Sequence, residues 1–189
     1  MRRRILGLAV AAMAVAGSMT LGGPASAGDT TVDAVVTAGS LTISSQPASA
    51  TLTGAVFNET LPSQATGAFG DVTVSDGRGI SLAWSMTASS TNFVGQTDNT
   101  KSIPLSAGSP LQFGAVASPT IGPNATSGTC VVEGGSLVAA NTGVAIATGA
   151  NLLTGLTPTT CTFNPDLTLT VPANTPPQTY RGTVTLTVA

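Results

Sequence analysis

The chain of 189 residues contains no histidine, only two cysteines, and few charged or aromatic side chains. Without histidine, catalytic arrangements of the Ser-His-Asp and Cys-His kinds are excluded, and so is the commonest transition-metal ligand. Charged residues make up 7% of the chain, whereas ordinary soluble domains carry about 25%. Threonine, serine, asparagine, glutamine and glycine must therefore cover the surface. Such a surface suits a wall-exposed or sugar-facing protein, although a biased genome alone also produces this composition.

The first 27 residues have the pattern of a signal peptide. Three arginines precede a short apolar run, and the segment ends in Pro24-Ala25-Ser26-Ala27, small residues of the kind that signal peptidase reads. The apolar run is shorter than the roughly 20 residues that span a bilayer, and no later segment is long and apolar enough to span. We therefore expect a signal peptide at 1–27, a short flexible segment at 28–36 and one exported domain at 37–189.

Cleavage would also change the charge balance, because three of the six basic residues lie in the signal peptide. The mature chain keeps Arg78, Lys101 and Arg181 against eight acidic residues, a net charge of −5. Nucleic acid and anionic lipid bind clustered lysine and arginine, so both are disfavoured as partners.

Short runs of alternating apolar and polar residues, separated by Gly, Pro, Ser and Asn clusters, predict an all-β fold. No segment has convincing helical periodicity, and 144–153 is the most ambiguous stretch. Many short strands with polar turns indicate a single Ig-like two-sheet β-sandwich, with a closed barrel as the alternative. The predicted strands are 40–44, 50–56, 70–75, 79–87, 102–106, 111–116, 129–133, 144–147, 160–163, 166–171 and 180–188.

The segment from Asp71 to Phe93 has the pattern of a complete β-hairpin. Asp and Gly tolerate the left-handed backbone that reverses a chain, so the turn is expected at Asp76-Gly77-Arg78-Gly79. We expect the two arms to pair in one sheet, with Asp71 in contact with Arg78 across the hairpin. Apolar residues occupy every second position of the arms: Val72, Val74, Ile80, Leu82, Trp84 and Met86.

Trp84, the only tryptophan, has two interpretations. Its spacing matches that of Ile80, Leu82 and Met86, which favours a place in the core. The alternative is an apolar platform that stacks on a ligand such as a sugar.

The last two predicted strands, 167–171 and 180–188, are expected to be neighbours, one of them near a sheet edge. Pro172 and the pair Pro176-Pro177 end the first of them. In the second, one face is apolar and the other consists of threonine; the apolar face comprises Tyr180, Val184, Leu186 and Val188.

The two cysteines, Cys130 and Cys161, predict a single disulfide in an exported chain. We expect this bond to fasten the Gly-rich stretch from Glu133 to Pro158 onto the sandwich. A redox role is disfavoured because there is no C-x-x-C motif and no basic neighbour that would lower a thiol pKa.

The carboxylates do not form a recognisable catalytic set. Asp71 and Asp76 lie an odd number of positions apart, so on a regular strand they point to opposite faces and do not form a glycosidase pair. We therefore expect no enzymatic activity, cofactor or metal, with hydrolysis by scattered carboxylates as the alternative. A calcium site stays open as well, although the chain has no EF-hand loop; its candidate ligands are Asp76, Asp98, Glu133 and Asp166.

Several of these residues resemble the WxL-domain proteins of Gram-positive bacterial surfaces. The run Val74 to Gly79, followed by Trp84-Ser85-Met86 and then Phe93, is similar to that family's D-x-R-G turn and first W-x-L motif, with Met86 in place of leucine. Leu41-Thr42-Ile43 fits the beginning of the domain. Tyr180, Gly182 and the alternating tail are similar to the family's final strand, with Leu186 and Val188 where the second W-x-L motif has Trp and Leu.

The resemblance implies a β-rich domain that attaches non-covalently to peptidoglycan or associates with other surface proteins. We expect a secreted, cell-wall-associated binding module, whose candidate motif or binding residues are Asp76, Arg78, Trp84, Met86 and Tyr180. A structural subunit of a surface fibre or adhesin is the alternative, because Thr-rich strands and a C-terminal edge are able to pair with another chain. The sequence leaves the ligand and the oligomeric state open.

Overall fold

The computed structural model describes residues 39–78, 82–108, 110–122, 129–138, 143–150 and 159–189. In this part of the chain, fifteen β-strands form four antiparallel sheets, and there is no helix. The predicted all-β fold is confirmed. The predicted signal peptide and the segment 28–36 lie outside the described residues, and Thr37–Ala189 belongs to one compact unit.

The four sheets are named A to D, and their strands are given in spatial order. Sheet A contains β1 (Leu41–Ser45), β3 (Val72–Asp76), β12 (Thr159–Phe163) and β8 (Thr120–Ile121). Sheet B contains β10 (Gly135–Leu137), β7 (Leu111–Phe113), β13 (Asp166–Val171) and β2 (Ser63–Ala68). Sheet C contains β15 (Val184–Val188), β4 (Ala83–Ser90), β11 (Val144–Ala150) and β9 (Thr129–Val132). Sheet D contains β14 (Tyr180–Arg181), β5 (Phe93–Gly95) and β6 (Ser102–Ile103).

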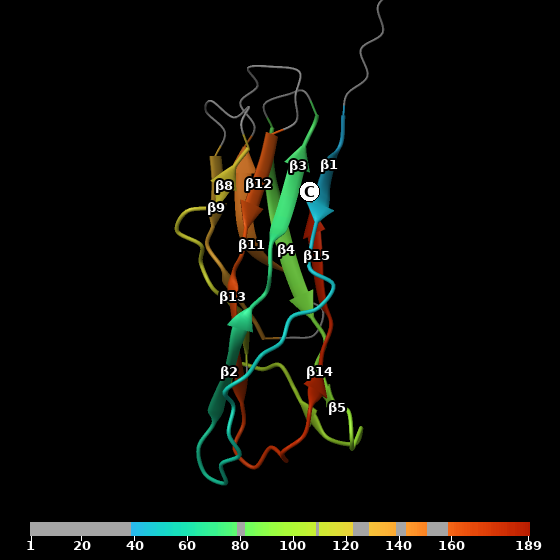
Figure 1. Ribbon diagram of the computed structural model, residues 1–189, viewed down its shortest axis with the longest axis vertical. Coiled ribbons are helices and arrows are strands. Elements are labelled where there is room, and N and C mark those ends of the chain that lie inside the picture. Colours follow the sequence, from blue (N-terminus) through green and yellow to red (C-terminus); the bar gives the residue numbers. More distant parts are fainter. Residues whose placement is uncertain (1–38, 79–81, 109, 123–128, 139–142, 151–158) are drawn as a thin grey trace, which may run out of the picture. The chain divides into compact units, whose positions relative to one another are not determined.

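Short interruptions divide four long strands between these sheets. β2 continues into β3, β12 into β13, β4 into β5, and β14 into β15 (Figure 1). The breaks in the first two lie side by side, where Phe69 N–H donates to Pro165 O at 2.9 Å and Gly70 N–H to Asn164 Oδ1 at 3.0 Å. Proline lacks the N–H that a ladder needs, and Gly70 has a φ of 106°, so neither residue continues a regular strand. Sheets A and B thus form one layer of a sandwich, and sheets C and D form the other.

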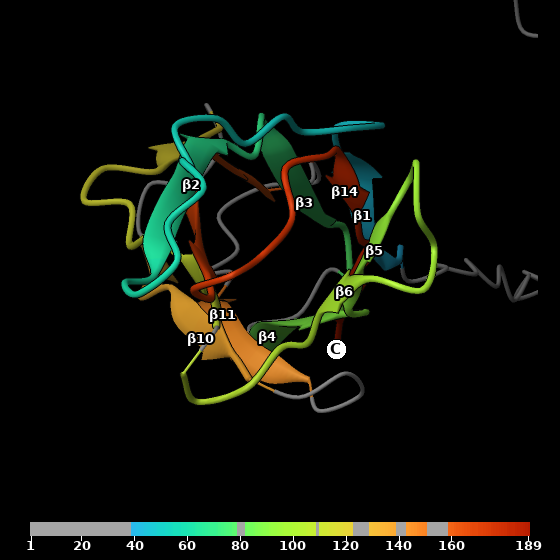
Figure 2. The ribbon, with the colours of Figure 1, turned by 90° about the horizontal axis from the view of Figure 1, so that it is seen from below.

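The predicted hairpin is wrong. β3 pairs with β1 and β12 in sheet A, whereas β4 pairs with β11 and β15 in sheet C. The chain between them crosses from one layer to the other, and Figure 2 shows β3 and β4 in separate layers. Alternation does not distinguish the two arrangements, because a strand of a sandwich buries one face whichever layer it joins. Leu82, expected in the core, is 48% exposed in the crossover, and Ile80 lies outside the described residues.

Other strand predictions differ in outcome. β13 has the predicted bounds, and the ambiguous stretch from Val144 forms β11. The predicted strand at 50–56 is wrong, because this segment makes only an isolated bridge between Thr53 and Thr66. β13 and β15 are not neighbours, since β13 lies between β7 and β2 while β15 pairs with β4; the position of β15 at a sheet edge is confirmed. The predicted strands did not include β2, β5, β8 and β10.

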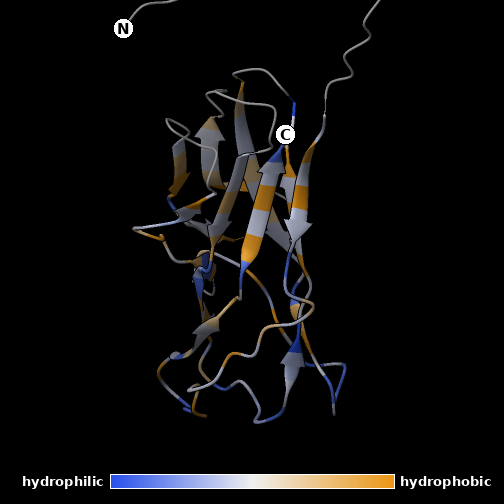
Figure 3. Ribbon diagram, turned by 45° about the horizontal axis from the view of Figure 1, so that its top comes forward, coloured by the Kyte–Doolittle hydropathy of each residue, from blue (hydrophilic) through white to orange (hydrophobic). Residues whose placement is uncertain are grey.

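The core lies between the layers and is built from the inward residues of both. Its fully buried side chains include Met86, Leu111, Ile146 and Val72, and burial of each such side chain stabilises the fold by about 1.5–3 kcal/mol. Apolar and polar residues alternate along the strands (Figure 3). In β15 the predicted pattern is confirmed: the apolar residues are partly buried and the threonines are exposed.

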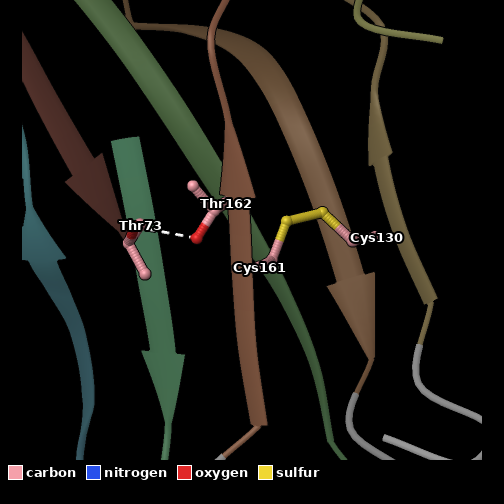
Figure 4. The surroundings of a disulfide bond; sticks show 4 residues. All are labelled: Thr73, Cys130, Cys161 and Thr162. Carbon is pink, nitrogen blue, oxygen red and sulfur yellow. Dashed lines mark hydrogen bonds between the residues drawn. A yellow bond between two sulfur atoms is a disulfide. The ribbon is translucent and has the colours of Figure 1, made fainter. Parts of the chain in front are cut away.

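The predicted disulfide between Cys130 and Cys161 is confirmed. Cys130 lies in β9 of sheet C and Cys161 in β12 of sheet A, so the bond joins the two layers (Figure 4). On the other face of β12, the Thr162 hydroxyl makes a 2.9 Å hydrogen bond with the hydroxyl of Thr73. The expected Gly-rich excursion is wrong for the described part of 133–158, which forms β10 and β11 in two different sheets.

Candidate functional site

Asp76 and Arg78 form a tight ion pair at the crossover from β3 to β4. Asp76 is 2% exposed and the Arg78 side chain 19%. Arg78 Nε donates to Asp76 Oδ1 at 2.9 Å and Nη2 donates to Oδ2 at 2.8 Å, while the Arg78 backbone N–H reaches Oδ1 at 3.1 Å. Nη2 also donates to the carbonyl oxygens of Leu82 and Ala83, at 3.1 and 3.4 Å. The pair therefore links the end of β3 to the start of β4 by hydrogen bonds. The predicted contact between Asp71 and Arg78 is wrong, because Arg78 pairs with Asp76 instead.

The electrostatics of this pair favour ionised side chains. The hydrogen bond from the Arg78 side chain holds the pKa of Asp76 below its ordinary value, although burial of the carboxyl acts in the opposite direction. The same hydrogen bond raises the pKa of Arg78. A carboxylate fixed in this way stabilises the crossover and is a poor proton donor near neutral pH.

Trp84 and Met86 are core residues. Met86 is fully buried and Trp84 is 6% exposed. Trp84 lies opposite Gly149 of β11, and its indole covers this glycine so closely that a Cβ at position 149 would overlap the ring. The platform interpretation of Trp84 requires an exposed ring face, which this packing does not leave. Trp84 is among the residues that line a shallow depression of about 470 Å³.

A groove of about 720 Å³ lies between sheets B and D, at the end of the sandwich opposite the crossover. We call it the interlayer groove. Its floor consists of core residues from both layers, namely Ala65, Phe93, Ile103 and Leu169. One wall is the loop 49–58, and the other is the segment 171–182. Of the five candidate residues from the sequence, only Tyr180 belongs to this groove.

Hydrogen bonds fix the side chains of the second wall. The Tyr180 hydroxyl donates to Pro176 O at 3.0 Å and accepts from Gln178 Nε2 at 3.3 Å. Gln178 Oε1 in turn accepts from the backbone N–H groups of Thr97 and Asp98, at 3.1 and 2.9 Å. On the first wall Phe57, at 51% exposed, presents an aromatic ring to solvent. The groove thus has an apolar floor and walls with oriented polar groups, and polar and apolar atoms contribute about equally to its lining.

Both walls contain backbone groups at the edge of the strand pairing. Gln96 N–H donates to Thr179 O, and Gly95 N–H donates to Lys101 O on the opposite side of β5. In an antiparallel pair, successive residues turn their backbone groups alternately toward and away from the partner strand. The N–H and C=O groups of Tyr180 and Gly182 therefore lie on the edge of β14 that faces away from β5. On the other wall Thr53 uses both backbone groups to bond Thr66, at 2.7 and 2.9 Å. Its neighbours Leu52 and Gly54 make no backbone hydrogen bond within the described part of the chain, and Gly54 has a φ of 96°.

The groove has few ionisable side chains in its lining. Its described lining contains no carboxylate, and its titratable residues are Tyr180 and Arg181. Among the described residues there is no group of three or more His, Cys, Asp or Glu side chains that would hold a metal ion, so the candidate calcium ligands do not come together. Sequence reasoning missed the groove because distant segments line it; the only signals were Tyr180 and the nearby prolines.

Comparison of the chain with protein families, with characterised proteins and with solved structures finds no match in any of the three. A search of the described residues for helices that are long and apolar enough to cross a membrane finds none. The functional interpretation therefore rests on the geometry of the groove and on the sequence.

Proposed function

We propose that the protein is an exported, non-enzymatic binding module of the cell surface. It associates non-covalently with the cell wall or with a surface protein complex, and its partner occupies the interlayer groove. The observation that carries this proposal is the groove itself, an open apolar floor between walls that carry aromatic rings, polar groups and one cation, Arg181, without a carboxylate in its described lining. The similarity to WxL-domain proteins supports the same class of function.

Two further features support a place outside the cytoplasm. The predicted signal peptide would direct export, and a disulfide between the layers is stable in an oxidising compartment. The exposed threonines of β15 give an uncharged polar surface of the kind that suits a wall environment.

Co-sedimentation of the mature chain, 28–189, with insoluble Gram-positive peptidoglycan over a range of salt tests the proposal. An unrelated acidic β-sandwich protein serves as the control for non-specific pelleting. Ala55→Trp fills the groove from its exposed wall, and Ala107→Trp adds the same bulk at an exposed turn outside the groove lining.

Saturable pelleting that Ala55→Trp abolishes and Ala107→Trp retains would support attachment to the wall through the groove. Equal pelleting of all three proteins would overturn the groove as the wall site. An absence of pelleting would move the proposal to a protein partner.

One observation favours a second candidate, a subunit of a surface fibre. The backbone N–H of Ser85 donates to Ala189 O at 2.8 Å, and the N–H of Ala189 donates to Ser85 O at 2.9 Å. Because backbone groups alternate along an antiparallel strand, every second residue of β15 before Ala189 turns its N–H and C=O away from β4. Those of Val184, Leu186 and Val188 make no backbone hydrogen bond in the described part of the chain. β1 contacts β15 on this side, so pairing of β15 with a strand of another chain would require β1 to move aside. Sedimentation velocity showing a monomer at every concentration would count against this candidate.

A further inference from the structure

We infer that the interlayer groove is the interface of a two-fold symmetric dimer, in which residues 56–61 of each copy pack into the groove of the other. We call these residues the apolar tip. The inference rests on the proposed binding site and deepens it, because it names a second copy of the chain as the partner at the groove. Its argument comes from the exposure, the fixed shape and the charges of the apolar tip.

Three large apolar side chains are exposed in the apolar tip. Val56 is 71% exposed and Leu61 63%, and Phe57 lies between them in the chain. Together they are three of the eight large apolar side chains that the described part of the chain exposes. The rest of the described surface consists mostly of small polar residues, so this concentration at one place is typical of an interaction surface.

Hydrogen bonds hold the apolar tip in a fixed turn. Asn58 Oδ1 accepts from the backbone N–H groups of Thr60 and Leu61, both at 2.9 Å. Asn58 O accepts from the N–H of Asn174 at 2.8 Å, which joins the tip to the segment that carries the second wall. A protrusion that is fixed in advance loses little conformational freedom when it binds, so its apolar contacts are retained as affinity.

The protrusion and the groove lie next to each other on the same molecule. Val56 and Phe57 line one side of the groove, whose floor is apolar, whereas Leu61 lies outside the lining. Each copy therefore carries both a protruding apolar group and an apolar recess. A two-fold axis places the tip of each copy against the floor of the other, and this exchange closes at two copies.

The charges favour a second copy as the occupant. Glu59 is the acidic residue of the tip, and Arg181 is the only cation in the described lining of the groove. Neither forms an ion pair within the described part of the chain, whose salt bridge joins two other residues. In the two-fold arrangement each Glu59 meets Arg181 of the other copy, which gives two equivalent pairs. Such complementarity fixes the orientation of two chains that would otherwise repel, because each mature copy carries a net charge of −5.

Sedimentation velocity of the mature chain, 28–189, over a range of concentrations tests the inference with a matched pair of variants. Leu61→Ser removes an apolar side chain from the tip and leaves the groove lining unchanged. Leu82→Ser removes another exposed leucine, at the crossover from β3 to β4, and serves as the control.

Wild type and Leu82→Ser should show the same equilibrium between monomer and dimer, with no larger species. Leu61→Ser should raise the Kd of the dimer at least about tenfold, because a side chain near the centre of the interface is lost. Thermal unfolding of Leu61→Ser close to that of Leu82→Ser shows that the fold is kept.

Charge reversal tests the pairing of the two copies directly. Glu59→Arg and Arg181→Glu each bring like charges together, so each should raise the Kd at least about tenfold at low salt. An equal mixture of the two variants should restore the dimer, because both contacts of the mixed dimer then pair an arginine with a glutamate.

A wild-type chain that stays monomeric, an assembly that grows beyond two copies, or a mixture that fails to restore the dimer would overturn the inference. If wild type is monomeric and Ala55→Trp still abolishes pelleting with peptidoglycan, the proposed function stands and the dimer fails. If the charge variants restore the dimer and no protein pellets, the dimer stands and attachment to the wall fails.

Discussion

Replacement of Arg78 by methionine should destabilise the fold through the carboxylate that it leaves behind. Asp76 is 2% exposed and receives two side-chain hydrogen bonds from Arg78, at 2.9 and 2.8 Å. Loss of one partner of a buried pair costs about 3–5 kcal/mol. We expect about 3 kcal/mol, the lower end, because the backbone N–H of residue 78 still donates to Asp76. Arg78→Lys keeps the charge but loses the two-pronged geometry, so about 1 kcal/mol is expected.

The pH dependence of Arg78→Met gives a second readout with a definite sign. In wild type the pKa of Asp76 is lowered in the folded state, so the stabilisation is present above the ordinary value of 3.8 and is lost as the pH falls through the lowered pKa. In the variant the hydrogen bonds from the Arg78 side chain are gone while the burial of the carboxyl remains, so the pKa of Asp76 is higher than in wild type. Asp76 then binds a proton in mild acid, which relieves the buried charge. The difference between wild type and variant should therefore be largest near neutral pH and should narrow below about pH 4.

Urea unfolding followed by Trp84 fluorescence, near neutral pH and near pH 3, measures both effects. A double-mutant cycle with Asp76→Asn isolates the interaction between the two side chains, because the doubly substituted protein has neither charge. Asp76→Asn with Arg78→Met should lose less stability than the sum of the single variants. A difference of less than about 0.5 kcal/mol between wild type and Arg78→Met near neutral pH would refute the reasoning, and so would a difference that does not change with pH.

Other sites give further expectations. Gly149→Ala places a Cβ against the indole of Trp84 and the carbonyl oxygen of Thr129. It should lower the free energy of unfolding by about 2 kcal/mol and shift the fluorescence of Trp84 to longer wavelength. An unchanged spectrum and an unchanged stability would contradict the packing. In wild type, Trp84 emission should be blue-shifted and poorly quenched by iodide, because the ring is buried. Cys130→Ala with Cys161→Ala opens a loop with a sequence separation of 31. This should lower the free energy of unfolding by about 3.7 kcal/mol in the loop-entropy model. Urea unfolding measures the loss, and wild type in reductant, which should lose the same amount, is the control. Tyr180→Phe removes the hydroxyl that joins two parts of the groove wall, so it should cost about 1 kcal/mol and weaken pelleting with peptidoglycan. Unchanged pelleting would exclude a role for this wall.

Local patterns predicted the strands well where one face of a strand is buried. β13 and β15 carry regular alternation, and the prediction of strand there is confirmed. β2, with the sequence SQATGA, contains no large apolar residue, and β5, β8 and β10 are at most three residues long. Such segments join a sheet because neighbouring strands supply the pairing, which is a property of the tertiary structure.

The candidate residues show the same division. Spacing placed Trp84 and Met86 correctly in the core, because burial of alternate residues is a local requirement of a half-buried strand. Spacing misplaced Asp76 and Arg78 in a hairpin, because Asp and Gly serve equally well in a tight turn and in a crossover between layers. The ion pair that holds the crossover depends on how the Arg78 side chain folds back, and no spacing rule specifies that.

The sequence by itself determined the fold class and the disulfide, and it supplied the prediction of export. Alternation and the number of cysteines follow from the chain directly. Only the tertiary structure decided which layer each strand joins, that the disulfide connects the layers, and that a groove lies between sheets B and D. The physical reason is the distance along the chain between interacting segments: β3 pairs with β12, and the groove forms where β2, β6, β13 and β14 meet. Such contacts depend on how the whole layers pack, and a local sequence pattern does not identify the distant segment with which it pairs.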